Sequence, residues 1–125
     1  MIKVGDWRNL EVINVRNNRL RMLPLEMGRW VRLKTLFAGN NGIMELPEEV
    51  TIGQCTALES LDLQKNALSH LPSSLSLCVN LAFLHLGNNR ITEMKPSLYE
   101  ALVNLKEAYL NRNKLQSLPP EVCVD

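Results

Sequence analysis

The sequence lacks the features that mark secreted, membrane-spanning or strongly charged proteins. No apolar run approaches the roughly 18 residues that a membrane span needs. Residues 1–7 include no hydrophobic stretch of signal-peptide length. The 125 residues carry a formal charge of only +1, so nothing global indicates nucleic acid or a membrane as a partner. This length predicts one domain, and we place it at residues 1–125.

Cysteine is scarce. The three cysteines, Cys55, Cys78 and Cys123, are an odd number and are widely spaced, without the spacing of metal ligands. This pattern favours a reducing, intracellular compartment. We therefore expect a cytoplasmic protein, with cytoskeletal and axonemal locations also open.

Motifs of catalysis and cofactor binding are missing as well. There is no nucleophile–base pair, no phosphate-binding glycine loop and no carboxylate pair at a persuasive spacing. We interpret the segment 39–42, Gly-Asn-Asn-Gly, as the end of a strand and the turn after it, and not as a nucleotide loop. The sequence thus predicts no enzyme, no cofactor and no metal site.

What the sequence does have is a repeat. The segment from Leu58 to Leu68 follows the template L-x-x-L-x-L-x-x-N-x-L, and the template recurs from Leu10, Leu33, Leu81 and Leu105. Successive starts are 23, 25, 23 and 24 residues apart. A period in the low twenties predicts a solenoid, in which each repeat buries its hydrophobic face against its neighbours. The predicted repeats are 10–32, 33–57, 58–80, 81–104 and 105–125, after a partial repeat at 1–9.

Template positions four and six alternate with polar residues, which predicts one short strand in each repeat. Parallel strands need a crossover between them, so the rest of each repeat should form the convex side. We expect a helical stretch at 97–102, after Pro96. The second repeat has two extra residues, and we expect a bulging loop at 51–54. The inward-facing pairs should be Ile13 and Val15, Leu36 and Ala38, Leu61 and Leu63, Leu84 and Leu86, and Ala108 and Leu110.

Template position nine is asparagine in every repeat. The residues are Asn18, Asn41, Asn66, Asn89 and Asn113. The chain turns inward there, so backbone N–H and C=O groups become buried without strand partners. An amide side chain offers donors and an acceptor together, which suits it to satisfy those groups.

Two further columns predict the convex half of the core. The position three residues before each repeat holds Trp7, Trp30, Cys55, Cys78 and Leu102. The position six residues before each repeat holds Val4, Met27, Ile52, Leu75 and Tyr99. Residues of these types are often buried. Cys55 and Cys78 are therefore interpreted as core thiols instead of a reactive pair, and Trp30 as core instead of a binding aromatic.

The outward positions of the strands form the candidate binding surface. Three of the six aromatic residues, Phe37, Phe83 and Tyr109, should point away from the core, with Gly39 and Gly87 leaving shallow gaps beside them. Aromatic residues among few charges are typical of interface hot spots, although scattered exposed aromatics are also ordinary. The predicted partner-binding residues are Arg16, Phe37, Asp62, Lys65, Phe83, His85, Tyr109 and Arg112.

Charge differs along the chain. Residues 1–34 carry eight basic and three acidic side chains, a net charge of +5, and the remaining residues carry −4. Arg16, Arg19 and Arg21 should lie at one edge of the first repeat. One interpretation is a solenoid whose basic end meets an acidic partner. The other is ordinary solvated charge on the rim.

The repeats, together with the pattern Leu-Pro-x-x-Leu-x-x-Cys-x-x-Leu from Leu71 to Leu81, resemble those of intracellular leucine-rich repeat proteins. The resemblance covers nearly the whole chain. It implies an α/β solenoid with a curved parallel sheet on the concave face and an irregular or short helical convex side. It also implies a non-enzymatic protein–protein interaction module, as in scaffold proteins that bind small GTPases, phosphatases, kinases or cytoskeletal and ciliary assemblies.

Three functions stay open at this level. The first is a module that binds a protein partner on its concave face. The second is a structural subunit of a large assembly, whose neighbouring subunits cover both ends, because neither terminus shows a distinct capping repeat. The third, an extracellular receptor fragment, would need capping disulfides.

Overall fold

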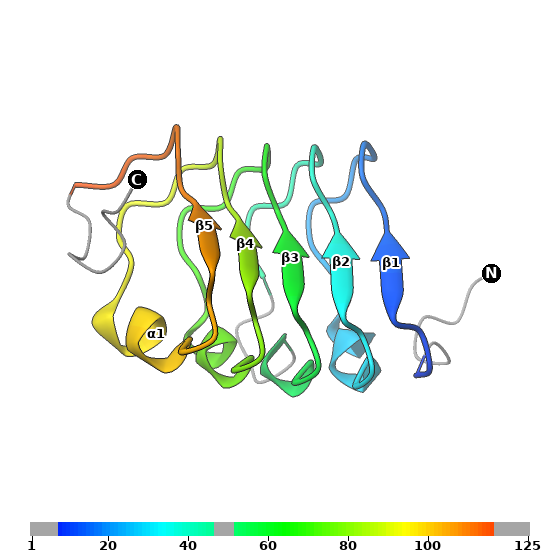
Figure 1. Cartoon of the computed structure of the whole chain (residues 1–125). Helices are drawn as coiled ribbons and strands as arrows, with labels where there is room; N and C mark the ends of the chain where they lie inside the picture. Colours follow the sequence, from blue (N-terminus) through cyan, green and yellow to red (C-terminus); the bar gives the residue numbers. More distant parts are fainter. Residues whose placement is uncertain (1–7, 47–51, 117–125) are drawn as a thin grey trace.

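The computed structural model describes residues 8–46 and 52–116, and each of five repeats contributes one three-residue strand. The strands are β1 (Val12–Asn14), β2 (Thr35–Phe37), β3 (Ser60–Asp62), β4 (Phe83–His85) and β5 (Glu107–Tyr109). They pair in parallel, in chain order, into one sheet (Figure 1). The register joins equal template positions, so that Leu36 lies opposite Leu61. The predicted solenoid with a parallel sheet is confirmed.

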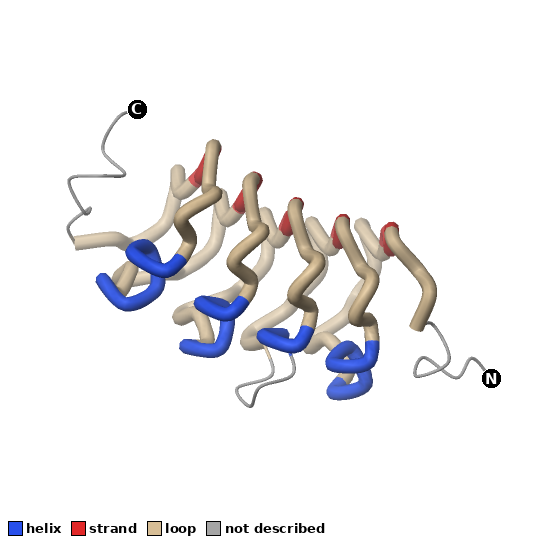
Figure 2. Tube along the Cα trace, turned by 60° about the horizontal axis from the view of Figure 1, so that its bottom comes forward, coloured by secondary structure: helices blue, strands red, loops and turns tan. Residues whose placement is uncertain are grey.

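The return segments place a row of short helices on the side away from the strands (Figure 2). These are the 3-10 helices η2 (Leu25–Arg29), η3 (Ile52–Gln54) and η4 (Ser73–Leu77), and the α-helix α1 (Pro96–Ala101). Pro24 and Pro72 precede η2 and η4 in extended conformation, with φ of −71° and −68°. Pro96 is the first residue of α1, as expected of a residue whose missing N–H has no helical partner there.

The core fills the space between the sheet and these helices. Trp30, Cys55, Cys78 and Leu102 are buried, as predicted, and so are Met27, Ile52 and Leu75. Trp7 and Val4 lie outside the described residues.

The last level of the convex core differs from the prediction. Leu98, and not Tyr99, is the buried residue there. After η4, the N–H of Cys78 donates to the carbonyl of Leu75, three residues earlier in the chain. After α1, the N–H of Leu102 donates to the carbonyl of Leu98, four residues earlier. An α-turn takes one residue more than a 3-10 turn, so the buried position moves one residue towards the N-terminus.

Of the bulging loop expected at 51–54, Thr51 lies outside the described residues, and residues 52–54 form η3. Ile52 and Gly53 are buried in η3, in line with the neighbouring helices. A Cβ atom at Gly53 would lie 2.7 Å from the carbonyl oxygen of Ser74 and 2.9 Å from Leu77 Cδ1. Close packing of η3 on η4 therefore requires glycine at this position.

The asparagines satisfy backbone groups at the inward turn, as predicted, and four of them, Asn41, Asn66, Asn89 and Asn113, also bond the preceding repeat. Asn66 Nδ2 donates to the carbonyl of Leu63 at 2.9 Å in its own repeat and to that of Ala38 at 3.1 Å in the preceding one. Its Oδ1 accepts from the backbone N–H of Ile43 at 3.0 Å and of Asn41 at 3.2 Å. Each amide thus satisfies backbone groups that the inward turn leaves without strand partners.

Candidate protein-interaction surface

The sheet register assembles the middle of the concave face from one residue of each strand. This central row consists of Asn14, Phe37, Asp62, His85 and Tyr109. The row alongside it consists of Val12, Thr35, Ser60, Phe83 and Glu107. Because strand side chains alternate between the two faces, these rows face away from the core, and five of the eight predicted residues lie in them.

Arg16 joins three repeats across the central row. Its guanidinium carbon lies 4.0 Å from the centre of the Phe37 ring, and its Nη2 lies 3.5 Å from Asp62 Oδ2. A guanidinium over an aromatic ring is attracted by the negative face of the ring. The Arg16 side chain remains 42% exposed, whereas that of Asp62 is only 6% exposed. Arg16 therefore covers the acid and the ring while its outer side remains open to a partner.

Asp62 holds the neighbouring side chains of Arg16 and Gln64 in place and offers little surface of its own to a partner. Its Oδ1 accepts from the backbone N–H of Gln64 at 3.1 Å, and its Oδ2 accepts from Gln64 Nε2 at 3.4 Å. With Arg16 added, the carboxylate has three donors and little exposure. We place Asp62 beneath the surface that a partner would meet.

His85 and Tyr109 form a second aromatic unit at the other end of the row. Their rings stack with centroids 4.6 Å apart and planes 28° from parallel. The Tyr109 hydroxyl donates to Glu107 Oε1 at 2.9 Å, and this bond to the carboxylate raises the pKa of Tyr109. Tyr109 is nevertheless 46% exposed. Phe83, in the adjacent row, is half-buried.

The expected gaps at the glycines are absent. Gly39 and Gly87 are both buried. A Cβ at Gly39 would lie 3.3 Å from Gln64 Cγ, and one at Gly87 would lie 2.8 Å from Asn111 Oδ1. The side chain of the next repeat occupies each space, because equal template positions stack. The sequence pattern shows the missing side chains but not what fills their place.

Lys65 and Arg112 lie beyond the strands, at template position eight. All five residues at this position have left-handed backbone: Asn17, Asn40, Lys65, Asn88 and Arg112, with φ from 56° to 59°. Asparagine tolerates this conformation better than other non-glycine residues. The three asparagines are the sequence signal for this left-handed turn, and the repeat template by itself does not predict it.

The two described cysteines are core thiols. Cys55 and Cys78 are free and buried, and their Sγ atoms donate to the carbonyls of Met27 and Ile52 at 3.2 and 3.3 Å. Burial raises the pKa of Cys55 to about 12, with Cys78 adding to the effect, and that of Cys78 to about 11. Thiols held protonated in this way are poor nucleophiles. Cys123 lies outside the described residues.

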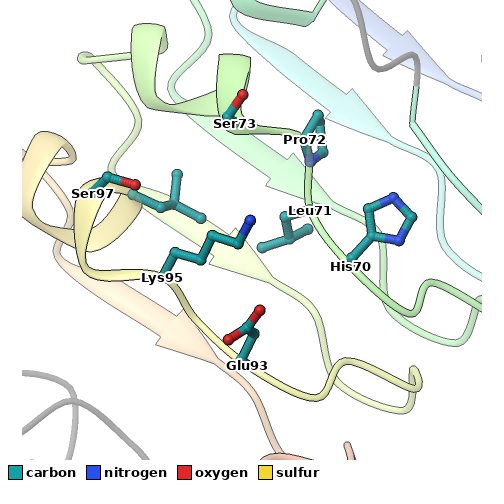
Figure 3. A pocket seen from close by; sticks show the side chains of 8 residues that line it. His70, Leu71, Pro72, Ser73, Glu93, Lys95 and Ser97 are labelled. Atoms are coloured by element: carbon teal, nitrogen blue, oxygen red, sulfur yellow. The ribbon is translucent and has the colours of Figure 1, made fainter.

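One small pocket lies between η4 and α1. It has a volume of about 90 Å³, and His70, Ser73, Glu93 and Lys95 are among its lining residues (Figure 3). Sites for organic ligands are typically about 300–1,000 Å³. Among residues 8–46 and 52–116 no group of three or more His, Cys, Asp or Glu side chains could hold a metal ion. Within the same ranges, no helix is long and apolar enough to cross a membrane.

Comparisons with known proteins agree with this geometry. Residues 31–91 match the family model for the leucine rich repeat. A comparison with curated proteins gives no match. A solved leucine-rich repeat protein of Leptospira interrogans is similar to 94% of the chain at 31% identity, with a TM-score of 0.85, and the match covers 29% of that protein.

Two solved structures from Listeria monocytogenes show the same fold. The internalin InlF matches 90% of the chain at 22% identity (TM-score 0.70), and the functional domain of InlJ, which includes a cysteine ladder, matches 94% at 24% identity (TM-score 0.79). The chain covers 32% and 24% of these proteins, so it spans about a third or less of the structures it matches. By its repeats, its sheet and these matches, the chain has the leucine-rich repeat fold, which generally serves non-enzymatic protein interaction.

Proposed function

We propose that this chain is a non-enzymatic binding module that holds a protein partner on its concave face. The observation that carries the proposal is the central row, in which Phe37, His85 and Tyr109 stay outside the core and are held by contacts of their own. Stacking under Arg16 orders Phe37, and mutual stacking orders His85 and Tyr109. Side chains ordered before binding lose less entropy when a partner arrives, and Arg and Tyr are enriched at hot spots.

The size of the sheet limits how a partner uses it. Five strands about 4.8 Å apart span only roughly 19 Å. Each three-residue strand adds a width of only roughly 10 Å, so the area of the sheet falls well short of the roughly 800 Å² that each side of a standard interface buries. The partner therefore also contacts the rim of the solenoid.

The test replaces Phe37 and Tyr109 by alanine together. A partner is first isolated with the unaltered chain as bait, and its dissociation constant is then measured by calorimetry. We expect at least about a 30-fold loss of affinity, since truncation of a single hot-spot residue already costs about 2 kcal/mol or more and two such losses are not additive. The matched control truncates Leu25 and Val103, which are exposed apolar residues away from the sheet. Equal affinity of the Phe37→Ala/Tyr109→Ala chain, with an unchanged melting curve, would move the site off the concave face.

We also propose that the chain is of the intracellular Leu-Pro-x-x-Leu class and resides in a reducing compartment. The free, buried thiols of Cys55 and Cys78 support this. Alkylation followed by mass spectrometry should modify neither thiol in the native chain and all three cysteines after denaturation. If alkylation of the denatured chain without reductant leaves the cysteines unmodified, they form disulfides, which would favour the extracellular alternative instead. The structural-subunit alternative rests on the ends of the chain, which lie outside the described residues, and it stays a prediction from the sequence.

A further inference from the structure

The turns that follow the strands carry a charge of one sign. We call template positions seven to twelve of all repeats the turn edge; it consists of residues 16–21, 39–44, 64–69, 87–92 and 111–116, which lead out of the arrowheads in Figure 1. Its basic residues are Arg16, Arg19, Arg21, Lys65, Arg90, Arg112 and Lys114. None of its 30 residues is Asp or Glu. With a formal charge of +1 for the whole chain and +7 on this edge, all other residues together carry −6.

These bases are open to solvent. All seven are exposed, and only Arg16 forms a salt bridge within the described residues, to Asp62. Surface bases are normally interspersed with acids, which lowers their mutual repulsion. Here half of the 14 bases lie on one edge without an acid among them. The bases thus gather on one edge of the solenoid, and Arg19 and Arg21 lie on the same edge as Lys65 and the later bases.

The backbone keeps this edge in register. The N–H of Lys65 donates to the carbonyl of Gly87, and that of Asn88 donates to the carbonyl of Asn111, both at 2.9 Å. Position eight of neighbouring repeats therefore stays one strand spacing apart, about 4.8 Å. At Lys65 and Arg112 the chain uses a base in a left-handed conformation that asparagine adopts more easily.

An apolar pair interrupts the bases. The second repeat has no base on the turn edge, and there Met44 is 59% exposed. Met22, which is 58% exposed, follows the turn edge of the first repeat directly and forms a backbone bridge with Glu45, the residue after Met44. The N–H of Met44 donates to the carbonyl of Arg21 at 3.1 Å, so this pair adjoins the arginines of the first repeat. Unbranched methionine side chains adapt to the shape of an apolar group that binds them.

We propose that the turn edge binds an acidic segment of a protein, whose carboxylates face the bases and whose apolar side chains cover Met22 and Met44. Charge complementarity supplies the attraction, and the apolar pair favours a peptide over a bare polyanion. Single-stranded nucleic acid needs rings for base stacking beside the bases, and the turn edge has no aromatic residue. Arg16, Lys65 and Arg112 belong to both sets of residues, but the concave-face test changes only Phe37 and Tyr109, so either proposal can fail without the other.

The probe is a fluorescent peptide of about twelve residues with the repeating sequence Glu-Glu-Leu, long enough to span the five repeats. Its binding is measured by anisotropy. We expect Arg19→Gln, Arg112→Gln and Lys114→Gln together to weaken binding about tenfold, as three exposed ion pairs allow. Raising NaCl from about 50 to about 500 mM should remove most of the binding of the unaltered chain, because salt screens exposed charges.

The matched control changes Arg29, Arg32 and Lys95 to glutamine, which removes the same charge from exposed positions away from the turn edge. We expect less than a twofold effect from it. An equal loss in both triple variants would overturn the proposal, since only net charge would then matter. So would equal binding of a Gln-Gln-Leu peptide.

Two further binding measurements test whether the ligand is an acidic protein segment, a nucleic acid or a membrane. A single-stranded oligonucleotide of equal charge, and vesicles containing phosphatidylserine, are offered in place of the peptide. Tighter binding of either one, lost in the edge variant, would assign the turn edge to nucleic acid or to membrane instead of an acidic protein segment. The Phe37→Ala/Tyr109→Ala chain should bind the peptide unchanged, which separates this result from the concave-face test.

Discussion

Arg16 and Phe37 are joined across two repeats, with the guanidinium carbon of the first 4.0 Å from the ring centre of the second. The same arginine reaches Asp62 in the third repeat. Stacked repeats usually contact only their nearest neighbours. The Arg16 side chain, by contrast, connects the first repeat with both the second and the third. The contact also orders the surface that we propose for partner binding.

The first prediction concerns this contact. Arg16→Ala should lower the free energy of unfolding by about 1–2 kcal/mol, because it removes the cation–ring attraction and leaves a shielded carboxylate with fewer donors. Arg16→Lys keeps the charge but loses the planar group, and it should recover only part of the loss. Urea denaturation measures both. A double-mutant cycle with Phe37→Ala that gives no coupling would mean that the two side chains do not interact in solution.

The second prediction concerns the asparagine ladder. Asn66→Ala should cost about 1–3 kcal/mol of stability, since buried N–H and C=O groups in two repeats lose their partners. Asn80→Ala is the control: Asn80 is exposed and makes one bond, to the carbonyl of Thr56 at 3.0 Å. Its melting curve should nearly overlay that of the parent. If Asn66→Ala also overlays the parent, the ladder does not stabilise the fold.

The third prediction concerns the left-handed turn. Lys65→Asn should stabilise the chain by about 0.5–1 kcal/mol, because asparagine adopts positive φ at lower cost. Lys106→Asn, which removes the same charge at a residue without positive φ, is the control for charge alone. The Lys65 variant should also bind the acidic peptide more weakly. A melting temperature that does not rise would show that φ at Lys65 costs nothing.

The fourth prediction compares two glycines. Gly53→Ala should lower stability by about 1–3 kcal/mol, because the new methyl group meets the backbone of Ser74 and forces overpacking. At Gly42 a Cβ would lie 3.6 Å from the carbonyl oxygen of Leu20, an ordinary contact. Gly42→Ala should therefore be neutral, or stabilising by about 0.4–1 kcal/mol through the unfolded chain. Chemical denaturation of both variants checks the difference, and equal effects would contradict the packing of η3 on η4.

Much of the fold was readable from the sequence, because the repeat imposes one solution on every copy. Leu61 and Leu63 have the period of a strand, and Asn66 has an amide side chain that offers both donors and an acceptor to an inward turn. Since each repeat must stack on the next, these local rules also set the register. The candidate surface follows in part: Phe37 and Tyr109 lie outward because the positions beside them lie inward.

Only the tertiary structure decided which individual side chains are buried, covered or exposed once the repeats stack. Whether Leu98 or Tyr99 is buried depended on an α-turn replacing a 3-10 turn. Gly39 offers no gap because Gln64 of the next repeat covers it. The bases of the turn edge are scattered along the chain and become one surface only when the repeats align. Periodicity sets which face a residue belongs to, but contacts between repeats depend on distances across the stack, and those exist only in the folded chain.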